Sequence, residues 1–136
     1  MRRLQRAGVR ILARSRYFDA APVPPSRQPR FVNAVIRVET ELSPRSLLDL
    51  LHQIEAEAGR VRGERNAARS LDLDLLDYDG RVSPTDPELP HPRMHLRGFV
   101  LLPLADIAPG WLHPILGTPI QALIQALPPG EDVRPL

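Results

Sequence analysis

Residues 71–76 read Leu-Asp-Leu-Asp-Leu-Leu, an alternation of leucines with two aspartates that strongly limits how this segment can fold. In a β-strand, side chains two residues apart point to the same face. The pattern therefore predicts a strand whose leucines enter the core while Asp72 and Asp74 stand side by side on the other face. Two carboxylates this close repel each other, and a site that keeps both ionised usually supplies a cation such as Mg²⁺, which takes oxygen ligands and often brings substrate phosphates. The segment thus predicts a metal site, although the alternation alone is equally typical of the solvent face of an amphipathic strand.

The segment before these aspartates is rich in arginine, with Arg60, Arg62, Arg65 and Arg69. A guanidinium group offers a planar fork of donors that matches phosphate oxygens in pairs. Without context, such a run would be interpreted as a solvated charged loop. Its position directly before the aspartates favours phosphate binding instead.

The composition limits the classes of function. The chain has 136 residues, the size of one domain spanning 1–136. It has no cysteine, so any metal must be held by oxygen or imidazole ligands, and this fits a reducing cytoplasm. We expect neither a signal peptide nor a membrane span, because no run of about 18 apolar residues occurs. The net charge of +2 and the 4% aromatic content argue against nucleic-acid binding.

Hydrophobic periodicity predicts an α+β fold with an antiparallel sheet. Alternating patterns predict strands over residues 9–18 and 31–40, separated by a proline-rich loop. Ser43-Pro44 is a typical helix start, and we expect that helix to end at Gly59. Asp79-Gly80 is a favoured pair for a tight hairpin turn. Two further helices are expected, one in the apolar run that starts at Phe99 and one over residues 120–127.

Four blocks in this order resemble the 6-hydroxymethyl-7,8-dihydropterin pyrophosphokinase family, and the resemblance covers about residues 15–109. The blocks are residues 28–34 (QPRFVNA), 54–62 (IEAEAGRVR), 69–76 (RSLDLDLL) and 89–92 (LPHP) with 97–99 (RGF). The resemblance implies a ferredoxin-like α/β sandwich with an antiparallel sheet. It also implies an enzyme of folate biosynthesis that transfers diphosphate from ATP to the hydroxymethyl group of 6-hydroxymethyl-7,8-dihydropterin and releases AMP.

The same resemblance implies roles for individual residues. Asp72 and Asp74 would hold two Mg²⁺ ions that bridge the ATP phosphates, and Arg62 and Arg69 would act with them in catalysis. The ATP-binding residues would be Glu55, Arg60, Arg62, Arg65, Arg69, His91 and Arg97. Glu55 would support the nucleotide or hold the arginine loop in place, and His91 would donate to the nucleotide. The pterin would be bound by Phe31, Asn33 and Phe99, through ring stacking and the asparagine amide.

Two departures from the family accompany the resemblance. The family begins with a core strand and a Gly-Ser-Asn turn, and this sequence is expected to lack both. The sheet would then have a gap, with unpaired backbone groups that cost about 1–3 kcal/mol each. Either the start is misassigned or truncated, or the protein is a degenerate member. The second departure is Asn66-Ala67-Ala68, which replaces the Trp-Gly-Pro of many members and is expected to alter closure over the pterin.

Other functions stay open on the sequence alone. The missing first strand also fits a non-catalytic relative that binds a nucleotide or a partner protein. An RNA-binding ferredoxin-like module is a weaker alternative, because the strands contain few aromatic residues. As an enzyme, the protein is expected to act in the cytoplasm on ATP and the pterin, without nucleic acid or membrane partners. It is expected to be a monomer if the first strand is restored.

Several single residues also have simpler interpretations. Phe31 and Phe99 could be core residues, because an aromatic on an apolar face is usually core. Asn33 could cap a neighbouring loop, and His91, which lies beside prolines, could be a turn residue. No functional role is expected for His52, His95 and His113. Asp77 is assigned, with Asp79, to the turn.

Overall fold

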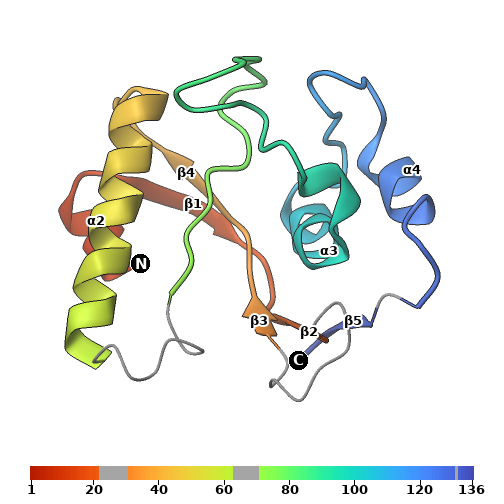
Figure 1. Ribbon diagram of the computed structural model, residues 1–136, viewed down its shortest axis with the longest axis horizontal. Coiled ribbons are helices and arrows are strands. Elements are labelled where there is room, and N and C mark those ends of the chain that lie inside the picture. Colours follow the sequence, from red (N-terminus) through yellow and green to blue (C-terminus); the bar gives the residue numbers. More distant parts are fainter. Residues whose placement is uncertain (22–30, 63–70, 131) are drawn as a thin grey trace.

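The computed structural model describes residues 1–21, 31–62, 71–130 and 132–136 of the chain. Its helices are α1 (Arg2–Arg6), α2 (Pro44–Arg62), α3 (Gly98–Ile107) and α4 (Ile120–Gln125), with a short 3₁₀ helix, η2 (Met94–Leu96). Its strands are β1 (Arg10–Arg14), β2 (Phe18–Ala20), β3 (Phe31–Asn33), β4 (Ile36–Glu39) and β5 (Val133–Pro135). Figure 1 shows α2 on one side of the molecule, α3 and α4 on the other, and residues 71–77 between them.

All the described strand pairs are antiparallel. β1 pairs with β4, and β2 lies between β3 and β5. The predicted α+β class with antiparallel sheets is therefore confirmed. None of the described helices is both long and apolar enough to cross a membrane.

Each of the two long strands that the sequence predicts is divided in two. Residues 9–18 give β1 and only the first residue of β2, which continues to Ala20, and residues 31–40 give β3 and β4. The break lies where the Ser15 hydroxyl accepts a hydrogen bond from the Val35 N–H at 2.9 Å, in place of a backbone carbonyl. The next N–H, that of Arg16, leaves the sheet and donates to Asp106 of α3 at 2.8 Å. Side-chain acceptors thus interrupt the ladder, which alternation alone does not reveal.

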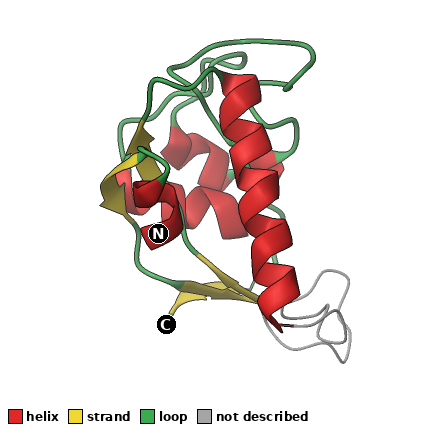
Figure 2. Cartoon of the chain, turned by 90° about the vertical axis from the view of Figure 1, so that its left-hand side faces the viewer, coloured by secondary structure: helices red, strands yellow, loops and turns green. Residues whose placement is uncertain are grey.

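The helix α2 begins where the sequence predicts. The Ser43 hydroxyl accepts a hydrogen bond from the Ser46 N–H at 3.2 Å, and Pro44 occupies the first helical position. The predicted end at Gly59 is wrong, because the helix continues through Arg62. Figure 2, which views the molecule from the side of α2, shows this helix running the length of the molecule.

Two apolar clusters hold the fold together. The first joins the buried face of α2 to the N-terminal residues through Leu4, Val9, Leu47, Leu51 and Ile54. The second joins α3 and α4, the two further helices that the sequence predicts, through Val35, Met94, Val100, Leu101, Leu104, Ile120 and Leu123. Because Leu73 and Leu75 pack on the first cluster and Leu76 on the second, residues 71–77 connect the two halves of the core.

The predicted strand at residues 71–76 does not form in the described structure. The segment belongs to none of the described strands, although its alternation persists: Leu73 and Leu75 are half-buried while Asp72 and Asp74 are exposed. A strand requires a hydrogen-bonded neighbouring strand, whereas in the described structure the Leu73 N–H donates to the Glu55 carboxylate and the Leu76 carbonyl accepts from the His91 N–H. The turn that follows is confirmed, because Asp79 and Gly80 both have positive φ (52° and 69°) and the Arg81 N–H donates to the Tyr78 carbonyl at 2.9 Å.

The end of this segment meets a group of partly and fully buried polar side chains. Asp77 was assigned to the turn, but its Oδ2 accepts a hydrogen bond from the Trp111 indole at 3.3 Å. The ring of Trp111 lies edge-on to that of His113, which in turn lies edge-on to His95, with centroids 5.7 and 5.2 Å apart. Asp77 therefore ties residues 71–77 to the segment that follows α3.

His113 makes stability depend on pH. Its Nδ1 accepts hydrogen bonds from the N–H groups of Ile115 and Leu116, at 3.2 and 3.1 Å. Burial lowers its pKa, as does neighbouring His95, while Asp77 acts in the opposite direction. Because the unfolded chain takes up this proton more readily than the folded one, the free energy of unfolding should fall as the pH drops below about 6.5.

We expect His113→Asn to weaken this pH dependence, because the asparagine carbonyl can accept the same N–H groups and does not titrate. The measurement is urea unfolding of both proteins at pH 7.5 and 5.0. The wild type should lose more unfolding free energy between these pH values than the variant does. Equal losses in the two proteins would show that His113 is not the titrating group.

Candidate active site

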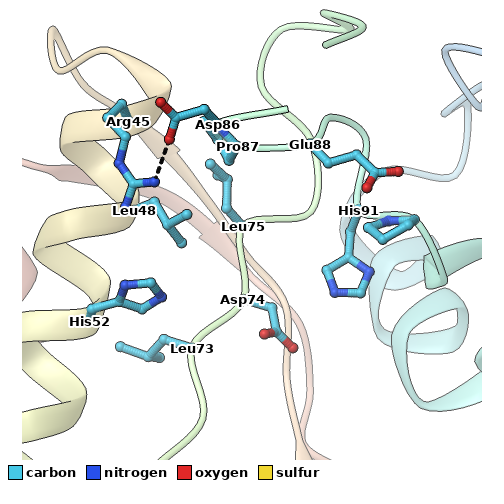
Figure 3. A pocket seen from close by; sticks show the side chains of 11 residues that line it. Arg45, Leu48, His52, Leu73, Asp74, Leu75, Asp86, Pro87, Glu88 and His91 are labelled. Carbon is cyan, nitrogen blue, oxygen red and sulfur yellow. Dashed lines mark hydrogen bonds and ion pairs between the residues drawn. The ribbon is translucent and has the colours of Figure 1, made fainter. Parts of the chain in front are cut away.

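A pocket of about 470 Å³ lies where three segments distant in sequence come together. One face of α2 contributes Arg45, Leu48 and His52. The acidic segment, residues 71–77, contributes residues 73–75, and the loop before η2 contributes residues 86–88, 91 and 92. Figure 3 shows the apolar side chains of Leu48 and Leu75 between the polar groups of the two sides. Such a mixture suits a ligand with a flat apolar part and charged groups.

The polar groups of the pocket come from opposite walls. In Figure 3, His52 projects from α2, and Asp74 and His91 lie across the pocket from it. At the rim, Arg45 pairs with Asp86 at 2.8 Å and links α2 to the loop. This ion pair contributes little to stability because its two side chains are 42% and 75% exposed. It nevertheless places an arginine and an aspartate at the pocket entrance.

Asp74 is the predicted metal ligand that lines the pocket. Asp72 is exposed two residues earlier on the same extended segment and is not among the lining residues. In the described parts of the chain, no three histidine or acidic side chains gather closely enough to bind a metal ion by themselves. Two carboxylates fit Mg²⁺, which commonly binds through one or two carboxylates and completes its octahedron with water and substrate phosphates.

His91 presents a hydrogen-bond donor beside Asp74. Its Nδ1 accepts a hydrogen bond from the Arg93 N–H at 3.2 Å, so the neutral ring carries its proton on Nε2. Burial is the main cause that lowers the His91 pKa, Asp74 opposes this change, and Arg97 adds to it. The imidazole is therefore neutral at physiological pH and can donate to an anionic ligand from Nε2.

Arg97 and Phe99 lie at the start of α3, just beyond this loop. The Arg97 guanidinium is 5.4 Å from the centroid of the Phe99 ring. Phe99 also packs against the second apolar cluster and is half-buried. Neither residue lines the pocket. Arg97 is nonetheless near enough to contribute to the lowered pKa of His91, so the structure brings these two predicted ATP-binding residues into one neighbourhood.

The other two residues predicted to bind the pterin, Phe31 and Asn33, lie on β3, outside the pocket. Phe31 is 47% exposed, so the interpretation as a core aromatic does not hold for it. Asn33 is half-buried, and its amide nitrogen is buried without a hydrogen-bond partner. An unpaired buried donor is costly, and a ligand carbonyl or ring nitrogen would satisfy it. This favours ligand binding for Asn33 over the capping of a loop.

Glu55 contacts the acidic segment. Its Oε2 accepts a hydrogen bond from the backbone N–H of Leu73, at 2.7 Å. Glu55 does not line the pocket. In the described residues it therefore supports the aspartate segment, whereas the sequence placed it at the nucleotide or the arginine loop.

The predicted arginine side chains lie outside the part of the chain that can be described. Arg60 and Arg62 belong to the last turn of α2, and nothing is stated of their side chains. Arg65, Arg69 and the Asn66-Ala67-Ala68 replacement fall within residues 63–70, which are not described. Their predicted roles stay predictions.

The sequence interpretation missed His52. This histidine lines the pocket, although it was given no functional role. A signal was present, because His52 follows Leu48 by four residues and precedes Glu55 by three, which places all three on one helix face. The spacing groups His52 with Leu48 and Glu55, whereas only the structure shows that this face meets the acidic segment.

The model of one protein family, described as 7,8-dihydro-6-hydroxymethylpterin-pyrophosphokinase, matches residues 1–109. The chain belongs to this family. The matched residues include β1–β4, α2, the acidic segment and α3, and therefore the whole pocket. The resemblance drawn from the four sequence blocks is thereby confirmed.

Individual members of the family are similar over most of the chain. A 2-amino-4-hydroxy-6-hydroxymethyldihydropteridine pyrophosphokinase of Haemophilus influenzae is 44% identical over 105 residues, covering 76% of this chain and 66% of the relative. One of Pseudomonas aeruginosa is 46% identical over 101 residues, covering 74% and 62%. The mitochondrial folate synthesis bifunctional protein of Arabidopsis thaliana is 42% identical over 108 residues, covering 79% and 20%. The chain thus spans about two-thirds or less of the length of these relatives.

Proposed function

We propose that this protein transfers diphosphate from ATP to the hydroxymethyl group of 6-hydroxymethyl-7,8-dihydropterin and releases AMP, in folate biosynthesis. The observation that carries the proposal is the position of Asp74 in a pocket opposite α2 and beside the neutral His91, in a member of this family. In the reaction, the pterin hydroxyl oxygen forms a bond to the β-phosphorus of ATP. The bond between that phosphorus and the α,β-bridging oxygen breaks, AMP leaves with this oxygen, and the hydroxyl proton is released.

Asp72 and Asp74 would hold Mg²⁺, with two ions expected. When bound, Mg²⁺ neutralises the charge of the phosphates and stabilises the charge that develops during transfer. The oxygen donors of the two carboxylates suit this ion, and both side chains are exposed. The dependence of activity on Mg²⁺ is part of the proposal.

The pocket supplies a binding site for the nucleotide. Its apolar side chains, Leu48, Leu73 and Leu75, offer a surface for the flat base. His91 would donate from Nε2 to a phosphate oxygen, and Arg97 would add positive charge near it. These groups would hold the triphosphate in place while the pterin hydroxyl approaches, so that positioning and electrostatics account for most of the catalysis.

The pterin would bind on the β3 side of the molecule. The unpaired Asn33 amide nitrogen would donate to the pterin ring edge, and the exposed Phe31 ring would cover its face. Phe99 is assigned to the same ligand, next to Arg97 at the start of α3. Action in the cytoplasm and a monomeric state stay predictions of the same proposal.

The test is to incubate the protein with ATP, Mg²⁺ and 6-hydroxymethyl-7,8-dihydropterin and to quantify AMP by chromatography. We expect AMP to form only in the complete mixture and not when the pterin is omitted or the metal is chelated. If no AMP forms above background while calorimetry detects ATP binding, the protein is a non-catalytic relative that binds the nucleotide, and the proposal of an enzyme is wrong.

A further inference from the structure

The acidic segment, residues 71–77, is extended without belonging to a described strand, so its position must be fixed in another way. Two hydrogen bonds to its backbone do this among the described residues. The Glu55 carboxylate accepts from the Leu73 N–H at 2.7 Å, and the His91 N–H donates to the Leu76 carbonyl at 2.8 Å. The first of these bonds falls between the two aspartates.

The place of that bond decides which side chains of the segment pack on the apolar core and which are exposed. Side chains alternate along an extended segment, so a shift by one residue turns every side chain to the opposite face. When the Leu73 N–H donates to Glu55, Leu73 and Leu75 pack toward the first cluster, and Asp72 and Asp74 are exposed. A one-residue shift would expose the leucines and turn the aspartates toward the apolar core.

Glu55 is well placed to fix this register. It lies on α2 next to buried Ile54 and four residues after buried Leu51, so its backbone belongs to the packed part of the helix. The helix therefore acts as a rigid support. The half-buried side chain of Glu55 brings an acceptor oxygen within 2.7 Å of the Leu73 nitrogen.

We propose that Glu55 is a positioning residue that sets the register of the acidic segment and so presents Asp72 and Asp74 together to the metal and phosphates. Its carboxylate replaces the backbone carbonyl of a neighbouring strand as the acceptor for Leu73. The metal-binding part of this inference rests on the proposed function, whereas the backbone part does not. The acceptor oxygen matters here, so an amide at the same position should serve almost as well.

Three variants of α2 test whether the acceptor oxygen of Glu55 or its charge positions the acidic segment. Glu55→Ala removes the acceptor, and it should fold because it deletes no buried apolar group and alanine favours helices. Glu55→Gln keeps an acceptor oxygen of the same reach but removes the charge. Glu57→Ala is the matched control, because Glu57 is a carboxylate two residues along the same helix that pairs with Arg3 at 2.8 Å.

The first readout is the hydrogen-exchange rate of the Leu73 amide, measured by NMR. We expect exchange to rise about tenfold or more in Glu55→Ala, because the Leu73 N–H loses its acceptor. Exchange should stay within a fewfold of wild type in Glu55→Gln and be unchanged in Glu57→Ala. The second readout is the affinity for Mn²⁺ together with a non-hydrolysable ATP analogue. It should weaken about tenfold in Glu55→Ala and recover in Glu55→Gln.

Three results would overturn the inference. Unchanged Leu73 exchange in Glu55→Ala would show that the bond does not hold the segment. A Glu55→Gln variant as impaired as Glu55→Ala would show that charge, not the acceptor, is what matters. Faster Leu73 exchange with unaltered Mn²⁺ affinity would break the link to the metal site. Failure of the proposed function is distinguishable, since a wild type that releases no AMP leaves the exchange result intact.

Discussion

Replacing Asp74 by asparagine should lower the rate of pterin-dependent AMP release by roughly a thousandfold. The substitution keeps the shape of the side chain and removes the charge that a metal ion requires. A metal ion on transferring phosphates contributes several kcal/mol of transition-state stabilisation, and each 1.36 kcal/mol is worth about tenfold in rate. Because Asp74 is exposed, the fold should be preserved. The measurement is the steady-state rate of AMP formation at saturating Mg²⁺ and both substrates.

Asp79→Asn is a matched control for this prediction. It removes the same charge five residues along the chain, at an exposed turn position with φ of 52°, where asparagine is favoured. We expect it to retain the wild-type rate. If Asp74→Asn also retained that rate, Asp74 would not be a metal ligand, and the pocket would need another role.

Replacing Leu101 by alanine should reduce the free energy of unfolding by about 2–5 kcal/mol. Leu101 is 0% exposed and lies in the second cluster, where α3 packs against α4 and η2. The cost combines the lost burial of the side chain with the cavity that remains, because neighbours such as Met94 and Ile120 belong to separate elements and can close on it only partly.

The measurement for Leu101→Ala is urea unfolding followed by circular dichroism. Leu96→Ala is the control, because Leu96 is 62% exposed on η2 and its truncation should change the free energy of unfolding by about 0.5 kcal/mol or less. If the Leu101 variant lost no more than the Leu96 variant, the α3–α4 cluster would not be the stabilising core.

The features that the sequence predicts correctly have local causes. The start of α2 follows from Ser43-Pro44, and the Asp79-Gly80 turn follows from the ease with which these two residues adopt positive φ. The exposure of Asp72 and Asp74 follows from their alternation with leucines. The four blocks together led to the family that the comparison confirms.

The features that the sequence does not predict depend on contacts between distant residues. The ladder breaks at Ser15 because its hydroxyl meets Val35, twenty residues away. Asp77 reaches Trp111, and Glu55 reaches Leu73, through side-chain hydrogen bonds that no periodicity records. The expected strand at residues 71–76 fails for the same reason, because alternation gives the faces of an extended segment and not its neighbours.

The most direct test of the account is a single turnover with ATP labelled with ³²P at the β-phosphorus, in the presence of Mg²⁺ and 6-hydroxymethyl-7,8-dihydropterin. Transfer of a diphosphate predicts that the label moves to the pterin and that the AMP formed is unlabelled. Label that stays in ADP would mean that only the γ-phosphate is transferred or hydrolysed. Label that stays in ATP would mean that the pocket binds the nucleotide without catalysis, and either result would contradict a diphosphate transferase.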